Sequence, residues 1–246
     1  MDSCFRRNDT SLLSCVVLRT MNNELRTKNG FSLMEVLLAI GILSIGMIFI
    51  AGVFPAAIYM TTFSTEQSIA AAAADEAFAK IKLYIQPTGI PGILQYGLTD
   101  PNIINPSEFF YPSTNESPAG KQYCWSALFK RVGPTDVQTT VFVCRKMTGW
   151  IVPAFQLVDV NSIGVLADEI FITDADKKMF INDGYTIVEN RFGRIYRVLE
   201  RYSPPNDNVV KLDRKWLGGS AVWVVPAPAG GGRYPCVAVY QKVIRF

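Results

Sequence analysis

The hydrophobic residues of this chain follow several different spacings, beginning with an unbroken run. Residues 36–63 contain no charged side chain. At about 1.5 Å of rise per residue, a helix of this length exceeds the roughly 30 Å hydrocarbon core of a bilayer. The run therefore predicts one transmembrane helix, and the sequence contains no second run of this kind.

A helical spacing continues after the run. Its apolar positions recur every three or four residues, at Ala70, Ala74, Ala77, Phe78, Ile81 and Ile85. The following Gln86-Pro87 pair is a typical helix stop. We therefore expect one helix from about residue 31 to residue 85. Its first half would lie in the membrane, and its alanine-rich second half would pack against a globular head.

The rest of the chain changes from irregular to β-rich. Proline and glycine punctuate residues 87–121, which predicts a connector without long elements. Residues 122–246 instead contain alternating segments such as VQTTVFVCRK and GRIYRVLERY, with turns expected at residues 182–184 and 190–193. The predicted class is α+β, with a long N-terminal helix packed on an antiparallel β-sheet head.

Composition removes several classes of function. The 246 residues are 49% hydrophobic, carry a net charge of +3 and include no histidine. Without histidine the chain lacks the usual general base and the commonest metal ligand, so we expect no enzyme, no cofactor and no metal site. Its lysine and arginine residues are scattered rather than gathered in a stripe, so we expect no nucleic-acid partner.

Positive charges before the apolar run set its orientation. They are Arg6, Arg7, Arg19, Arg26 and Lys28. The positive-inside rule then puts the N-terminus in the cytoplasm and the residues after the run on the other side of the membrane. The run is too long for a secretory signal, and no small-residue cleavage site follows it. Met21 is an alternative start, which would make residues 1–20 dispensable.

The residues around Gly30 resemble the type III signal of type IV pilins and pseudopilins. The letters KNG at residues 28–30 are followed by FSLME at residues 31–35 and then by the apolar run. In that family a prepilin peptidase cuts after the glycine and methylates the new N-terminal phenylalanine. The resemblance implies cleavage between Gly30 and Phe31 and N-methylation of Phe31, with residues 1–30 removed as a leader.

Glu35 is the residue that a membrane anchor alone does not explain. A charged side chain at the bilayer centre costs roughly 2.5–3.5 kcal/mol, and less near the interface. By resemblance, Glu35 is an assembly residue that pairs with the N-terminal ammonium of a neighbouring subunit. Alternatively, its side chain reaches the inner interface and has no such partner.

Four residues that weaken helices interrupt the run, namely Gly41, Gly46, Gly52 and Pro55. Small residues let neighbouring membrane helices approach closely. By resemblance, the same residues could let the helix kink or unwind when it leaves the lipid for a filament. Both interpretations stay open, and Pro55 lies slightly later than is usual in the family.

Cys124 and Cys144 form the candidate disulfide. If the strands on either side of Pro134 make a hairpin centred on it, the two cysteines lie directly opposite each other, within the Cα separation that a disulfide allows. An oxidising periplasm would permit the bond. Cys236 would then stay unpaired, and the two cysteines of the leader would be removed with it.

Three weaker motifs have ordinary structural explanations. Asp174, Asp176 and Asp183 suggest calcium, but their spacing does not match an EF-hand loop and solvated turns explain them better. The glycines at residues 230–232 lack the strand-turn-helix context of a phosphate loop. The tryptophans at positions 125, 150, 216 and 223 could line a groove, although core packing is the better explanation.

The expected division of the chain is a leader, a membrane and assembly helix, a helix in the head, a connector and a β-rich head. Their ranges are 1–30, 31–63, 64–86, 87–121 and 122–246. The expected function is a non-enzymatic minor pilin or pseudopilin of a type IV pilus or a type II secretion pseudopilus.

The expected location follows from the same resemblance. The chain would be a single-pass protein of the bacterial inner membrane with a periplasmic head, and would then enter a filament. Its partners would be a prepilin peptidase, other pilin subunits, an inner-membrane assembly platform and membrane lipid. The alternative is an anchored periplasmic binding domain that does not assemble.

Overall fold

The computed structural model describes most of the chain after the leader and divides it into two compact units. The described residues are 30–84, 95–96, 106–114, 117, 119–147, 155–162, 168–228 and 233–246. One unit ends at Met60, and the other comprises Thr61–Phe246. The expected leader, most of the expected connector, Trp150 and residues 230–232 lie outside the described residues.

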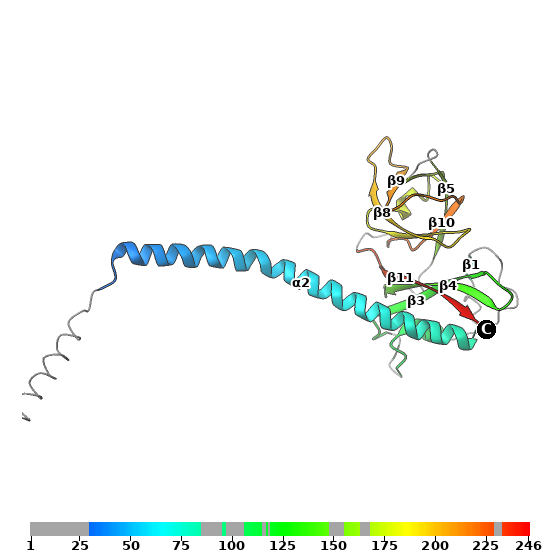
Figure 1. Cartoon of the computed structure of the whole chain (residues 1–246), viewed down its shortest axis with the longest axis horizontal. Helices are drawn as coiled ribbons and strands as arrows, with labels where there is room; N and C mark the ends of the chain where they lie inside the picture. The colour runs from blue at the N-terminus through cyan, green and yellow to red at the C-terminus, as the bar shows by residue number, and fades with distance from the viewer. Residues whose placement is uncertain are drawn as a thin grey trace, which may run out of the picture. The chain divides into compact units, whose positions relative to one another are not determined.

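One helix, α2 (Leu33–Tyr84), runs through both units, as Figure 1 shows. Every residue from 30 to 65 is exposed, including the large apolar side chains of the run. Within the described residues, α2 is the one helix that is long and apolar enough to cross a membrane. The division at residue 63 between a membrane segment and a helix in the head stays a prediction. The predicted N-terminal helix is confirmed.

The second half of α2 packs through small side chains. Its buried residues are Glu66, Ala70, Ala73, Ala74, Ala77 and Ile81. Alanines at helical spacing leave room for a close approach, and they contact apolar side chains of a β-sheet that include Trp125, Ala127 and Val141. The alanine stripe seen in the sequence therefore marks a helix-to-sheet contact.

The sheet beside α2 is antiparallel, in the order β1-β3-β4-β11, with β2 also paired to β3. Its strands are β1 (Gln95–Tyr96), β2 (Phe110–Tyr111), β3 (Tyr123–Arg131), β4 (Asp136–Arg145) and β11 (Cys236–Arg245). A 3-10 turn, η1 (Pro106–Phe109), precedes β2. The expected hairpin register is confirmed, because Cys124 lies opposite Cys144 and Trp125 opposite Val143.

The rest of the β-rich region forms a separate closed barrel in the order β10-β5-β6-β9-β8-β7. Its strands are β5 (Gln156–Ser162), β6 (Glu169–Ile172), β7 (Thr186–Glu189), β8 (Ile195–Arg201), β9 (Val209–Leu212) and β10 (Ala221–Val224). The short turn η2 (Lys178–Phe180) lies between β6 and β7. The predicted antiparallel β-rich head is confirmed, and its division into a sheet and a barrel was not predicted, because alternation is the same in an open sheet and in a barrel.

The two expected turns are confirmed, and both need glycine. Gly184 and Gly193 have φ angles of 78° and 72°, which residues with a side chain seldom adopt. Gly193 ends the β7–β8 turn, where the buried carboxylate of Glu189 accepts hydrogen bonds from the backbone N–H groups of Arg191 and Phe192, both at 2.5 Å. The turn is therefore held rigid by the barrel.

The sheet and the barrel share an apolar contact on the sheet face opposite α2. Phe142 of the sheet meets the ring of Phe155 at 4.7 Å between centroids, and Phe155 in turn meets Trp223 of the barrel. Trp125 and Trp216 are buried, and Trp223 is half-buried with its Nε1–H donating to Asn190. The three described tryptophans therefore belong to packed regions, as the sequence favoured.

Candidate functional site

The segment expected to carry cleavage and methylation stands in front of α2. The Ser32 carbonyl accepts the first helical hydrogen bonds, from Glu35 N at 2.9 Å and Val36 N at 3.1 Å. Gly30 and Phe31 therefore precede the helix, and the Phe31 side chain is 80% exposed. Among the described residues, none covers this peptide bond.

Nothing in the described part of the chain requires glycine at position 30. A Cβ placed there would meet no atom within 4 Å, and the residue does not have a positive φ angle. By contrast, Gly219 has a φ angle of 119°, and a Cβ there would collide with the buried Glu189 carboxylate. A glycine that its own fold does not need is consistent with a requirement set by another molecule.

Glu35 is exposed, and its carboxylate makes no ion pair or side-chain hydrogen bond in the described part of the chain. Its place in the first turn of α2 is favourable, because the N-terminal end of a helix dipole stabilises an acid by about 0.3–1 kcal/mol. Glu35 lies near one end of the apolar run, where a charge costs less than at the bilayer centre. Its pairing with an external partner stays a prediction.

The glycines and the proline of the run do not interrupt α2. The helix continues through Pro55, and a Cβ on Gly41, Gly46 or Gly52 would meet no atom within 4 Å. Glu35 and Gly46 are eleven residues apart, as are Gly41 and Gly52, so each pair shares one face of the helix. Kinking and packing against neighbouring helices both remain predictions.

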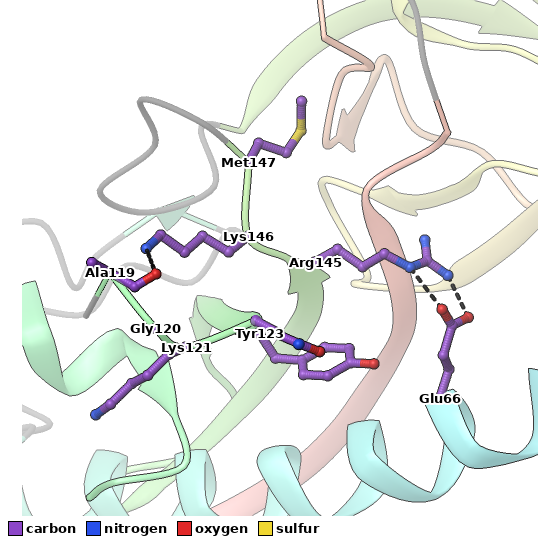
Figure 2. A pocket seen from close by; sticks show the side chains of 9 residues that line it. Glu66, Ala119, Gly120, Lys121, Tyr123, Arg145, Lys146 and Met147 are labelled. Atoms are coloured by element: carbon purple, nitrogen blue, oxygen red, sulfur yellow. Dashed lines mark hydrogen bonds and ion pairs between the residues drawn. The ribbon is translucent and has the colours of Figure 1, made fainter. Parts of the chain in front are cut away.

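A second polar cluster, centred on Glu66, was not found from the sequence. The Glu66 carboxylate accepts hydrogen bonds from Arg145 Nε at 3.0 Å and Nη2 at 2.5 Å, as Figure 2 shows. It also accepts from Arg233 Nη1 at 3.3 Å and Nη2 at 3.1 Å. The hydrogen bond from Arg145, together with the charges of both guanidinium groups, holds the pKa of Glu66 below its ordinary value of 4.5, against the opposing effect of burial.

The Glu66 cluster ties α2 to the end of β4 and to the segment before β11. Arg145 and Arg233 are 79 and 167 residues away from Glu66 in the sequence. No local pattern could have predicted this pairing. The only signal in the sequence is that Glu66 is the first ionisable residue after the apolar run.

A cavity of about 640 Å³ opens beside this cluster. Its lining residues are Glu66, Ala119, Gly120, Lys121, Gln122, Tyr123, Arg145, Lys146 and Met147. Two of the lining lysines are held by backbone carbonyls, with Lys121 Nζ 3.1 Å from the Thr114 oxygen and Lys146 Nζ 3.2 Å from the Ala119 oxygen. Of the described lining residues, Lys121, Arg145 and Lys146 are cationic and Glu66 is acidic.

The cysteines lie as expected, but the expected bond is not formed. Cys124, Cys144 and Cys236 are buried free thiols. Cys144 has a second neighbour that the sequence did not reveal, because β11 places Cys236 opposite it. Burial raises the pKa of Cys124 to about 12 and that of Cys144 well above its ordinary value, so neither thiolate is populated at neutral pH.

The acids that suggested calcium are used within the barrel region. Asp174 pairs with Lys177 at 2.9 Å and accepts the backbone N–H of Asp176, and Asp183 accepts the backbone N–H of Arg201. Among the described residues no group of three or more Asp, Glu, Cys or His side chains is placed to hold a metal.

Comparison with known proteins identifies one segment. Residues 25–51 match the prokaryotic N-terminal methylation motif, the motif of type IV pilin and pseudopilin precursors. The match includes Gly30, Phe31 and Glu35, and it implies processing by a prepilin peptidase and a structural subunit rather than an enzyme. No curated protein and no solved structure matches the chain.

Proposed function

We propose that this chain, which carries the N-terminal methylation motif at residues 25–51, is the precursor of a minor subunit of a type IV pilus or a type II secretion pseudopilus. The prepilin peptidase cleaves between Gly30 and Phe31 and methylates the amino group of Phe31. The mature chain, residues 31–246, is anchored by the first half of α2 with its head in the periplasm. An inner-membrane assembly platform then moves it into the filament.

The observation that carries this proposal is Glu35, an exposed carboxylate without an ion-pair partner in the described residues, at the start of an exposed apolar helix. In a filament the apolar surface of residues 36–63 is covered by the same segments of neighbouring subunits. A carboxylate buried there is costly unless an opposite charge lies beside it. The ammonium of a neighbour's methylated N-terminus is a positive charge at the matching end of the same segment.

The glycines at positions 30, 41, 46 and 52 support the same proposal. In the described part of the chain, no atom lies within 4 Å of a Cβ placed at any of these positions. Gly30 suits a peptidase that accommodates no side chain at the cut. The other three keep the helix surface small where neighbouring helices approach.

A second candidate function is a membrane-anchored binding domain that never assembles. The specific observation in its favour is the cavity of about 640 Å³ with its cationic lining. This function requires the anchor but does not require cleavage at Gly30.

The deciding experiment is mass spectrometry of the N-terminus of the protein isolated from its native host. We expect N-methylated Phe31 as the first residue. The Gly30→Lys precursor should stay uncleaved, whereas Asn29→Lys, which adds the same charge one residue earlier and keeps the glycine, should be processed. An intact leader on the wild-type protein would contradict the filament proposal and favour the anchored binding domain.

A further inference from the structure

The three described cysteines lie together on one face of the sheet. Cys124, Cys144 and Cys236 stand on the neighbouring strands β3, β4 and β11 and belong to one buried cluster on the face opposite α2. Cys144 is on the middle strand, and both of the other cysteines lie directly opposite it. Register alone therefore does not decide which of them could form a disulfide with Cys144.

The backbone hydrogen bonds of β4 distinguish the two candidate pairs. Arg145 N donates to the Pro235 carbonyl oxygen at 2.8 Å, so these two residues form a hydrogen-bonded pair of the ladder. Hydrogen-bonded and non-hydrogen-bonded pairs alternate along antiparallel strands. Cys144 and Cys236 are the next pair along, so they form a non-hydrogen-bonded pair.

The same rule assigns Cys124 and Cys144 to the other type of pair. Lys146 N donates to the Gln122 carbonyl oxygen at 2.7 Å. That pair lies two positions beyond the cysteines, so Cys124 and Cys144 form a hydrogen-bonded pair. Opposed Cβ atoms are about 4.5–5.5 Å apart and are closer in non-hydrogen-bonded pairs, whereas a disulfide needs about 3.5–4.5 Å. The pair of Cys144 with Cys236 therefore suits a disulfide better.

The side chains show the same preference. Burial raises the pKa of the Cys144 thiol well above its ordinary value, and a hydrogen bond with the Cys236 side chain raises that pKa further. Cys124 acts on the Cys144 thiol only through its charge. The Cys124 Sγ instead lies 3.7 Å from the Cys144 carbonyl oxygen. The Cys144 thiol therefore has its direct contact with Cys236.

We propose that Cys144 and Cys236 form a disulfide in the folded head and that Cys124 stays a thiol. The inference rests on the periplasmic head of the proposed function, because disulfides persist in that compartment. Strand β4 ends at Arg145, β11 begins at Cys236, and the barrel strands β5 to β10 lie between them in the chain. The bridge therefore joins the place where the chain leaves the sheet for the barrel to the place where it returns.

Formation of the bridge needs an oxidant, because the three cysteines are thiols in this structure. The oxidant is another disulfide, for which glutathione disulfide is the probe. Cys236, at 7% the most exposed of the three, attacks one sulfur of the probe as a thiolate and releases one glutathione. Cys144 then attacks the Cys236 sulfur of the mixed disulfide and releases the second glutathione. Two electrons pass to the probe, and the proton of each cysteine ends on a released thiol.

The test is disulfide mapping of the full-length protein in detergent after equilibration with glutathione disulfide. Cys4→Ser and Cys15→Ser leave only the three cysteines of the head. Free thiols are blocked with N-ethylmaleimide as the protein is denatured, and trypsin then places the three cysteines in the separate peptides 122–130, 132–145 and 234–242. We expect peptide 132–145 linked to peptide 234–242, a blocked thiol in peptide 122–130, and two glutathiones released per chain.

Two variants sharpen the test. Cys124→Ala is the matched control and should form the same bridge. Cys236→Ala should form no bridge, although Cys124 still lies opposite Cys144. In the wild type and in Cys124→Ala, oxidation should lower the unfolded fraction in denaturant roughly a hundredfold, because the bridge closes a long loop in the unfolded chain. In Cys236→Ala the probe should leave the unfolded fraction unchanged.

A bridge from peptide 122–130 to either of the other two peptides would overturn the proposal, and so would three blocked thiols after equilibration. The same map of protein isolated from its native host tests the location of the head. Free thiols there, together with a bridge formed by the probe, would contradict the periplasmic location and leave the pairing intact. The N-terminal mass of that sample reports cleavage at Gly30 separately.

Discussion

The two halves of α2 belong to one helix, but one half is exposed and the other is buried on one face against a sheet. From residue 33 to residue 60 every side chain is exposed, and a Cβ on any of the three glycines would meet nothing. From residue 66 to residue 81 the alanines on one face are buried against the sheet. The first half is apolar but packs against no described residue outside its own helix, whereas the second half packs against a sheet of the same chain.

This difference separates positions where a contact within the chain limits the size of the side chain from positions where no such contact does. Ala74 is 1% exposed, so a larger side chain there would have to displace the sheet. Gly46 has open space around it, so no contact among the described residues requires its small size. A constraint without an internal cause suggests an external partner, and it can be tested separately from the stability of the head.

The largest expected effect separates assembly from insertion. Glu35→Val should insert in the membrane at least as well as the wild type, because it removes a charge. Cleavage after Gly30 should persist. Incorporation into filaments should be lost, because the ammonium of a neighbouring Phe31 would have no counter-charge among apolar helices. Glu35→Asp should be intermediate. Sheared-filament assays in the native host compare the amount of each variant in the filament with the amount in the membrane fraction. Normal incorporation of the Val variant would show that Glu35 has no role in assembly.

The second prediction compares the same kind of change in the two halves of α2. Ala74→Leu should destabilise the head by about 1–3 kcal/mol, because a larger side chain overpacks the contact with the sheet. Gly46→Leu should leave the stability of the head unchanged, since no atom lies near that position. Denaturant unfolding followed by tryptophan fluorescence measures both. If both variants unfold at the same denaturant concentration, the proposed difference between the halves is wrong.

The third prediction concerns the ionic contact between α2 and β4. Glu66→Gln should destabilise the head by about 1–3 kcal/mol, between the values for exposed and fully buried pairs, because it leaves Arg145 without its counter-charge. Arg233→Gln should cost less, about 0–1 kcal/mol, because this arginine is largely exposed. The same unfolding assay ranks the two variants, and the reverse order would contradict the assignment of Arg145 as the principal partner.

The pH dependence of the Glu66 contact has a definite sign. The folded protein holds the pKa of Glu66 below 4.5, so the stabilisation is fully present above that pH and is lost as the pH falls through the lowered folded value. Wild type and Glu66→Gln should therefore converge in stability below pH 4.5. Unfolding curves between pH 3 and pH 7 measure this, and a constant difference across the range would exclude the linkage.

The smallest expected effect concerns the bridging and the alkylation of the cysteine thiols, which test the register of the sheet. Cys144 lies between Cys124 and Cys236 in register, so any single bridge should include Cys144. Burial should keep the thiols from alkylation in the folded state, because it raises the pKa of Cys124 to about 12. Thiol counting with and without denaturant distinguishes the three free thiols from the bridge that the sequence suggested. A Cys124–Cys236 bridge would show that the strand order is wrong.

The sequence by itself determined the features that depend on local spacing. These features are the charge-free run of residues 36–63, the alanine stripe and the α+β class. Each follows from the spacing of hydrophobic residues within individual segments. The hairpin register at Cys124 and Cys144 follows from one short turn. Gly30, Phe31 and Glu35 were recognisable because they belong to a short local pattern, which the motif match at residues 25–51 confirms.

Only the tertiary structure decided which distant segments meet. Alternating strands could equally form one sheet, so the barrel of β5 to β10 needed the long-range pairing of β10 with β5 and β7. The ionic partners of Glu66 are 79 and 167 residues away in the sequence, and β11 places Cys236 opposite Cys144 as a second neighbour. The physical reason is that period and hydrophobicity specify which face of a segment is buried, whereas the choice of partner depends on which buried faces fit together in three dimensions.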